Sequence, residues 1–195
     1  MAFSWGEFSE KAIESITGDH RRINIWDGAV RSGKTVCSVV AWLRFIISAP
    51  PGLLLMAGKT ERTLKRNILD PIASIIGDKF QISPSAGEAV IFGRAICLVG
   101  ANDQRAEGKL RGATLAGAYG DEITLWDESF FKMLLSRLSL ENAKFFGTTN
   151  PDSRYHWLLT DYLQNDGIDI ARHQFTLDDN LNLPKSYKEI GRAHV

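Results

Sequence analysis

An eight-residue run, Gly28-Ala-Val-Arg-Ser-Gly-Lys-Thr35, constrains the fold of this 195-residue chain more than any other feature of its sequence. It fits the pattern G-x-x-x-x-G-K-[ST], the Walker A motif, whose glycines let backbone N–H groups point at phosphate oxygens. The motif needs a strand before it and a helix after it. Residues 22–27 predict a short strand, and residues 34–48 predict a helix that ends before a pair of prolines. The sequence therefore predicts an α/β domain that binds a nucleotide.

Each residue type in this loop has a chemical reason to be there. The Lys34 ammonium would reach the β- and γ-phosphates of a nucleotide, and the Thr35 hydroxyl would ligate Mg²⁺. Arg31 would contact the γ-phosphate or face solvent. A glycine-rich surface turn without a ligand is the alternative for the whole loop. The predicted nucleotide-binding residues here are Gly28, Arg31, Ser32, Gly33, Lys34 and Thr35.

A nucleoside triphosphatase also needs an acid at the end of a strand beside the loop. Asp121-Glu122 follows the strand-like residues 115–119 and supplies it. Asp121 would hold Mg²⁺ directly or through water, and Glu122 would orient or deprotonate the attacking water. A solvated acidic pair is the alternative. Glu128 is a competing acid, but its position favours the first turn of the next helix.

Two further polar segments are candidates for the same site. Arg111 lies in a glycine-flanked segment, residues 108–112, that predicts an exposed loop. It would stabilise phosphoryl charge in its own or a neighbouring subunit, or be an ordinary surface arginine. Thr148, Thr149 and Asn150 emerge from a buried strand. They would hydrogen-bond the γ-phosphate or its water, or form an ordinary strand-end turn.

Apolar runs and helical patterns alternate along the rest of the chain. This alternation predicts an α/β fold in which helices flank a mainly parallel sheet. Strands are predicted at 53–57, 89–92, 95–99, 115–119 and 144–149, and helices at 60–69, 127–138 and 153–164.

Composition excludes several other classes of protein. Lysine and arginine balance aspartate and glutamate at 23 each, so a chain that coats nucleic acid through bulk positive charge is not expected. Two distant cysteines predict neither a disulfide framework nor a zinc cluster, and the four histidines lack metal-ligand spacing. No secretory signal or membrane-spanning run is recognised. We therefore expect a soluble, intracellular protein.

The motifs, taken in order, resemble those of the ATPase domain of the large terminase subunit of tailed bacteriophages. That family is the motor that packages genomic DNA into a procapsid. The resemblance covers residues 1–188 and rests on the Walker A run, the segment 53–59, Arg111-Gly112, Asp121-Glu122 and Thr148-Thr-Asn-Pro151. It implies the additional-strand class of P-loop NTPase, with a mainly parallel central sheet, and ATP and Mg²⁺ as ligands.

The resemblance also implies a role for each motif. Lys34 and Thr35 would bind the phosphates and Mg²⁺. Asp121 would bind the metal, and Glu122 would be the catalytic carboxylate. Arg111 resembles an arginine finger supplied to the neighbouring subunit of a ring, and residues 148–150 resemble the motif that couples hydrolysis to movement.

The partners implied by the resemblance are double-stranded DNA, the small terminase subunit and the portal protein of the procapsid, in the host cytoplasm. A homo-oligomeric ring is expected during packaging, and a monomer is compatible with the isolated chain. DNA would be held through its backbone phosphates. A candidate basic face on the helix 60–69, which has a solvated helix face as its alternative, comprises Lys59, Arg62, Lys65 and Arg66.

Three features depart from the family pattern. Ala12 stands where a glutamine that reads adenine is expected, so Phe8 or Trp26 would contribute to base binding instead. The chain is too short to hold the family's C-terminal nuclease domain. Residues 189–195 can be encoded by GAG ATC GGA AGA GCA CAC GTC, which contains the start of a common sequencing adapter. We expect a non-native tail there and a natural protein that continues beyond Lys188, with an ordinary polar C-terminus as the alternative.

Two other functions fit part of the pattern. A helicase-like or AAA-type P-loop ATPase would share the Walker motifs, although a complete helicase would need a second core. A nucleotide-binding module without turnover would need neither Glu122 nor Arg111.

The acidic segment Asp178-Asp179-Asn180 would lead toward a hinge or form a solvated turn.

Overall fold

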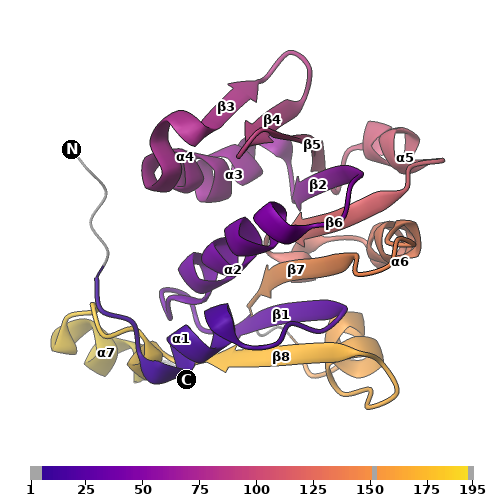
Figure 1. Cartoon of the computed structure of the whole chain (residues 1–195). Helices are drawn as coiled ribbons and strands as arrows, with labels where there is room; N and C mark the ends of the chain where they lie inside the picture. Colours follow the sequence, from indigo (N-terminus) through magenta and orange to yellow (C-terminus); the bar gives the residue numbers. More distant parts are fainter. Residues whose placement is uncertain (1–5, 151–152, 193–195) are drawn as a thin grey trace.

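The alternating strands and helices fold into an eight-stranded sheet covered by helices on both faces (Figure 1). This computed structural model describes residues 6–150 and 153–192. The strands are β1 (Ile23–Gly28), β2 (Leu53–Gly58), β3 (Phe80–Ser83), β4 (Glu88–Ile91), β5 (Arg94–Gly100), β6 (Leu115–Gly120), β7 (Lys144–Thr149) and β8 (Ile170–Phe175). The α-helices are α1 (Glu10–Thr17), α2 (Lys34–Ser48), α3 (Glu61–Leu64), α4 (Asp70–Ile76), α5 (Gln104–Leu110), α6 (Glu128–Arg137) and α7 (Lys185–Arg192).

The order of the strands is β3-β4-β5-β2-β6-β7-β1-β8. From β5 to β8 every neighbouring pair is parallel, and β3, β4 and β5 pair antiparallel at one edge. The strand before the Walker A loop, β1, is separated from the acidic strand, β6, by β7. This inserted strand confirms the additional-strand P-loop class.

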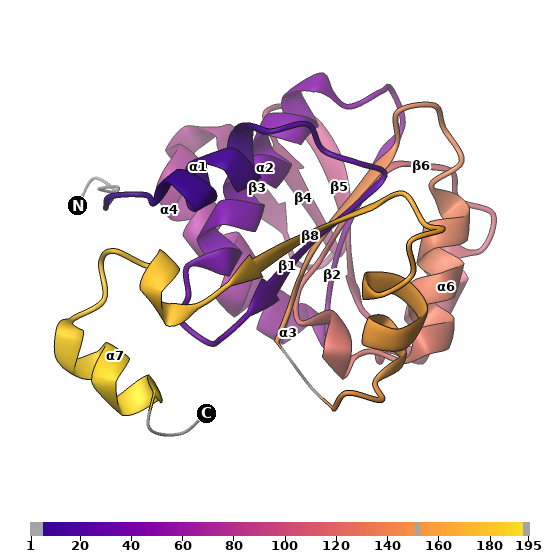
Figure 2. The ribbon, with the colours of Figure 1, turned by 90° about the horizontal axis from the view of Figure 1, so that it is seen from below.

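Two apolar layers hold the helices on the sheet. One joins α1, α2, α3 and α4 to the first face, and the other joins α5 and α6 to the opposite face (Figure 2). The central strands β1 and β6 are buried along their whole length, as expected for parallel strands with helices on both sides. The small residues of β6 allow close packing, since a Cβ at Gly117 would lie 2.4 Å from the Phe45 ring.

The helix predicted at 60–69 is longer and less regular than expected. It begins as α3, widens into a π-helical turn at Lys65–Leu69 (η1), and continues as α4 to Ile76. Pro71 does not end the helix, because it lies in the first turn of α4. Proline lacks a backbone N–H, and the π-helical turn before it already interrupts the α-helical hydrogen-bond pattern at this position.

Two other expectations were wrong in detail, and one helix was missed. The helix predicted at 153–164 is reduced to the π-helical turn Leu158–Leu163 (η4). Residues 108–110 lie in α5 and not in a loop, so Arg111 directly follows a helix. Helix α1 was not predicted, although Ser9 caps it by accepting the Ala12 N–H at 3.2 Å.

The chain ends in α7, which projects beyond the carboxyl edge of the sheet (Figure 2). The predicted tail 189–195 starts inside this helix, and its last residues, 193–195, lie outside the described part; the origin of the tail stays a prediction. None of the helices described is long and apolar enough to cross a membrane.

Candidate nucleotide-binding and catalytic site

The Walker A loop connects β1 to α2 at the carboxyl edge of the sheet. Gly33 has φ +92°, a backbone conformation that favours glycine, and α2 begins at the next residue. At Gly28 a Cβ would lie 1.9 Å from the carbonyl oxygen of Phe175 on β8. The two glycines are thus required for different reasons: Gly28 allows the close approach of two strands, and Gly33 allows the turn into the helix.

Lys34 points back under the loop. Its side chain is buried, and Nζ donates to the Ala29 carbonyl at 3.1 Å. Burial lowers the pKa of Lys34, while the charges of Asp121, Glu122 and Asp27 act in the opposite direction. The fold therefore brings the lysine of the loop and the acidic pair of β6 within electrostatic reach of each other, as the motif pattern requires.

Asp121 is buried at the end of β6 and held by donors from two other elements. Thr148 Oγ1 donates to Asp121 Oδ1 at 2.9 Å, and Asn67 Nδ2 donates to Asp121 Oδ2 at 3.3 Å. Burial raises the pKa of Asp121, and these hydrogen bonds offset part of that rise. Because these hydrogen bonds offset only part of the cost of burying the Asp121 carboxylate, this position is favourable for a cation.

Glu122 turns away from its neighbour because the backbone changes direction between them. Its φ and ψ of 52° and 55° are left-handed, which is rare for a non-glycine residue. Its N–H donates to Thr148 Oγ1 at 3.1 Å, so this one hydroxyl contacts both acidic residues. The Glu122 carboxylate makes no hydrogen bond within the described chain, which leaves it available to water.

The residues at this edge fit a triphosphate and Mg²⁺. Ser32 Oγ is buried in the loop without a hydrogen-bond partner among the residues described, as expected of a group that serves a ligand. Lys34 adds positive charge. Thr35 and Asp121 offer a hydroxyl and a carboxylate, the oxygen ligands that Mg²⁺ prefers.

The predicted coupling residues lie at the end of β7, between the loop and the acidic pair. Thr148 and Thr149 are buried, and Asn150 Oδ1 is buried without a partner among the residues placed. Beside them Asp27 is paired with Arg172 of β8, whose Nε lies 2.9 Å from Oδ2. Pro151, the last residue of the motif, lies outside the described residues.

Arg111 is the one predicted site residue that lies far from the others. It precedes β6, whereas Asp121 follows it, and the six residues of β6 span roughly 20 Å at about 3.3 Å each. The segment between α5 and β6 lies at the right of Figure 1, opposite the strand ends that carry the loop. Arg111 is exposed in this segment, and its predicted catalytic role stays a prediction.

A cavity of about 290 Å³ opens beside the loop. Phe8, Ala12, Val36 and Cys37 contribute to its lining together with loop residues, and the predicted role of Phe8 in base binding stays a prediction. The prediction that Trp26 would contribute to base binding was wrong, because Trp26 is fully buried in the core and donates to Ser15 Oγ.

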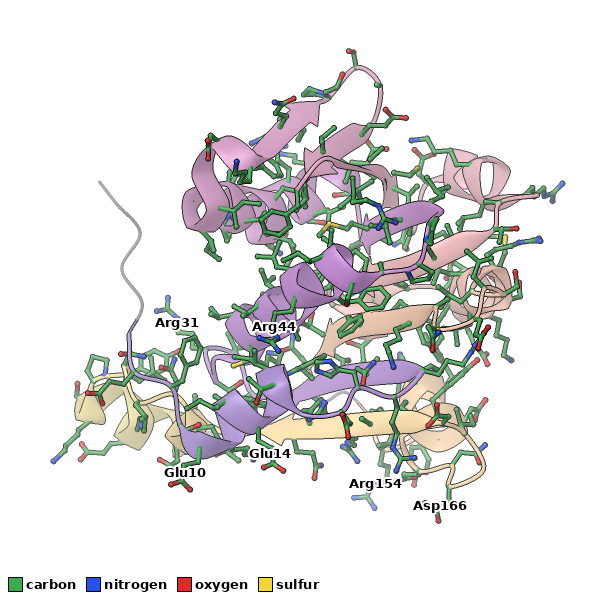
Figure 3. The ribbon with its side chains drawn as sticks, in the orientation of Figure 1. Glu10, Glu14, Arg31, Arg44, Arg154 and Asp166 are labelled. Atoms are coloured by element: carbon green, nitrogen blue, oxygen red, sulfur yellow. The ribbon has the colours of Figure 1, made fainter. Side chains whose placement is uncertain are left out.

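Sequence reasoning missed a set of contacts that tie the C-terminal segment to the loop. Asn180 Nδ2 donates to the Arg31 carbonyl at 2.7 Å, and the Asn182 side chain makes two hydrogen bonds with the backbone of Glu7. The Arg31 guanidinium, which is directed away from the strands in Figure 3, lies 5.4 Å from the ring centre of Tyr187 on α7. The segment around Asp179 is therefore partly packed against the loop, and its predicted lead toward a hinge stays a prediction.

Sequence reasoning also missed Asn67. The one available signal was an asparagine, a weak helix former, in the middle of a predicted helix. Nothing in the sequence showed that a π-helical turn would form there or that the residue would reach β6.

The inserted strand, the glycine loop and the acidic strand end together define a P-loop NTPase domain of the additional-strand class. Within this class the chain belongs to the family of terminase large subunits of the T4likevirus type, as their N-terminal part; the family model matches residues 26–193. No curated protein matches the chain.

Solved structures of large terminases share the fold of this chain. The large terminase of a thermophilic bacteriophage is 29% identical with a TM-score of 0.87, covering 97% of this chain and 51% of its own. The same protein has been solved with ADP and with ATP-gamma-S. The large terminase ATPase domain of Thermus phage P74-26, at 13% identity and a TM-score of 0.63, shares the fold over 94% of this chain and 91% of its own. The chain thus spans about half the length of the first of these two terminases.

Proposed function

We propose that this chain binds and hydrolyses ATP, and that it is the ATPase part of a motor that moves double-stranded viral DNA into a procapsid. The observation that carries the proposal is the meeting of Lys34 with Asp121 and Glu122 at one edge of the sheet, across the inserted strand β7. A nucleotide-binding module without turnover would not need a carboxylate held ready for water.

Each residue then has a definite task. The loop backbone and Lys34 bind the phosphates, and the Glu122 carboxylate orients the attacking water and accepts its proton. Thr148 fixes Asp121 and the Glu122 backbone relative to each other through its hydroxyl. A magnesium ion held by Thr35 and Asp121 would neutralise charge on the phosphates. Thr149 and Asn150 follow Thr148 at the end of β7 and would respond to the presence of the γ-phosphate.

The cavity beside the loop is our candidate for the base pocket. Its lining of Phe8, Val36 and Cys37 can pack against a purine, while Ala12 removes the amide expected to read adenine. The complexes of the thermophilic phage's large terminase with ADP and ATP-gamma-S support an adenine nucleotide as the ligand. Base selectivity would then depend on shape and backbone groups.

The position of Arg111 favours a ring of subunits. Because it lies at the opposite edge of the sheet, it would complete the site of a neighbour by stabilising phosphoryl charge. DNA, the small terminase subunit and the portal protein would be the partners of such a ring, and the host cytoplasm its location.

Phosphate release, measured with and without duplex DNA, tests the proposal. Wild-type protein with Mg²⁺ and ATP should release phosphate faster when DNA is added, and Lys34→Ala should abolish release. Lys132→Ala, an exposed lysine of α6, is the control and should behave as wild type. Hydrolysis by Lys34→Ala at the wild-type rate would overturn the proposal, and strand separation of a duplex would favour a helicase instead.

A further inference from the structure

Asp121 receives one of its two side-chain hydrogen bonds from outside the known motifs. The donor, Asn67, is half-buried in the π-helical turn η1, which follows β2, the other neighbour of β6. The turn is closed by the Asp70 N–H, which donates to the Lys65 carbonyl five residues earlier. Such wide turns recur at functional sites, and here the turn carries an amide that reaches the acidic strand.

The other end of the same amide is also held. Arg66 Nε donates to Asn67 Oδ1 at 3.1 Å, so the amide oxygen faces the arginine and the amide nitrogen faces Asp121. A continuous path of polar contacts results, from Arg66 through Asn67 to Asp121 and on to Thr148 and the Glu122 backbone. It links an exposed side chain to the catalytic edge of the sheet.

Arg66 belongs to an exposed basic segment. Lys59, Arg62, Lys65 and Arg66 are all exposed after β2. Within this segment Lys65 is paired with Asp70 at 2.6 Å, whereas Arg66 is joined to the neutral amide of Asn67 and keeps its charge uncompensated by a carboxylate in the described chain. A duplex DNA backbone, with its closely spaced phosphates, is the partner that complements this charge.

We propose that Asn67 is a positioning residue for Asp121 and that it couples DNA bound at Arg66 to nucleotide binding at the Walker A loop. This inference rests on the proposed function, because it needs a chain that binds both ligands. It concerns the communication between the two sites and not the existence of either.

The coupling follows from competition for one donor. A DNA phosphate that takes the Arg66 guanidinium removes the hydrogen bond that fixes the Asn67 amide. The amide is then free to turn, and Asp121 Oδ2 loses a donor and regains capacity for another ligand. By linkage, whatever engages Asp121 Oδ2 also favours release of Asn67 and so strengthens DNA binding. The two ligands should therefore bind with positive cooperativity.

Calorimetric titration with ATP-gamma-S and Mg²⁺ tests this without turnover, in the absence and in the presence of a saturating duplex of mixed sequence. In wild-type protein the duplex should tighten nucleotide binding by at least about fivefold, the lower end of typical allosteric coupling. In Asn67→Ala and in Arg66→Ala this ratio should fall to about one, while nucleotide binding without DNA persists.

Lys65→Ala is the matched control. It removes an equal charge from the adjacent position and should weaken DNA binding, yet its partner is Asp70 and not Asn67, so the coupling ratio should remain. A wild-type ratio in both Asn67→Ala and Arg66→Ala, or a ratio of one in wild-type protein, would overturn the inference and leave the ATPase proposal intact. Failure of wild-type protein to bind ATP-gamma-S or duplex would overturn both. Should Asn67→Ala fail to fold, Arg66→Ala alone decides the outcome.

Discussion

Asp121 and Glu122 are adjacent in sequence but lie in different environments. The strand ends at Gly120, Asp121 is buried with its two donors, and the left-handed backbone at Glu122 turns the next side chain out of the strand direction. One carboxylate is therefore suited to a cation and the other to water. The strain at Glu122 is a cost that the hydrogen bond from its N–H to Thr148 offsets.

Glu122→Gln tests this division of roles. The variant should keep its affinity for ATP-gamma-S, since the amide has the size of the carboxylate, while the rate of ATP hydrolysis falls by about 10²–10⁴-fold through loss of the base. Glu128→Gln is the control, because Glu128 is paired with Lys132 on α6 and should not affect the rate. An unchanged rate in Glu122→Gln would assign the base to another residue.

His173 gives a pH dependence that can be measured at the same scale. It packs against Trp26 with ring centres 4.5 Å apart; burial and the nearby His20 lower its pKa from 6.5 to about 4. Below pH 6.5 the unfolded chain takes up a proton that the folded protein refuses until about pH 4. The free energy of unfolding should therefore decrease as pH falls through this window.

Urea unfolding of wild-type and His173→Gln protein at about pH 6.5 and about pH 4.5 measures this contribution. Wild-type protein should lose roughly 1–2 kcal/mol more than the variant, after allowance for the partial exposure of the ring. An equal loss in the two proteins would show that His173 does not account for acid sensitivity.

At the scale of elements, the sequence predicted the strands and helices that carry the site and missed the irregular ones. The Walker A pattern and the apolar runs predicted α2 and β7 with the bounds observed. The π-helical turn at Lys65–Leu69 could not be predicted, because no local residue preference distinguishes it from an α-helix and packing decides it. Contacts such as Asn67 with Asp121 depend on strand order, which local patterns do not encode.

The junction of β1 and β8 yields a prediction about stability. In Gly28→Ala the added methyl group would collide with the Phe175 carbonyl, at a φ of +149° that suits glycine, so the free energy of unfolding should fall by about 3 kcal/mol. Gly108→Ala in α5 is the control. A methyl there meets nothing within 4 Å and should leave stability unchanged or raise it by up to about 1 kcal/mol. Equal stability of the two variants in urea would contradict the packing described at this junction.

At the scale of the whole molecule, one predicted site residue lies apart from the others. The loop, the acidic pair and β7 meet at one edge of the sheet, while Arg111 lies at the other. A head-to-tail ring would bring the arginine of one subunit to the site of the next. Within one chain, the C-terminal segment is also connected to the Walker A loop, because Asn180 and Tyr187 contact the loop residue Arg31.

Mixing two inactive variants tests whether Arg111 acts between subunits. Arg111→Ala keeps an intact loop and base, and Glu122→Gln keeps an intact arginine, so a mixed ring contains sites complete in both. ATP hydrolysis by the mixture should exceed that of either variant alone several-fold. A mixture no more active than its components would place the arginine's action within its own subunit or away from catalysis.

The central claim is that a triphosphate lies between the Walker A loop and the acidic end of β6. A crystal structure of this chain with ATP-gamma-S and Mg²⁺ tests it most directly. We expect the γ-phosphate within hydrogen-bond distance of Lys34, with the metal at Thr35 and Asp121 and Glu122 facing the phosphorus from across β7. A nucleotide bound elsewhere, or a γ-phosphate out of reach of both Lys34 and Glu122, would contradict the account.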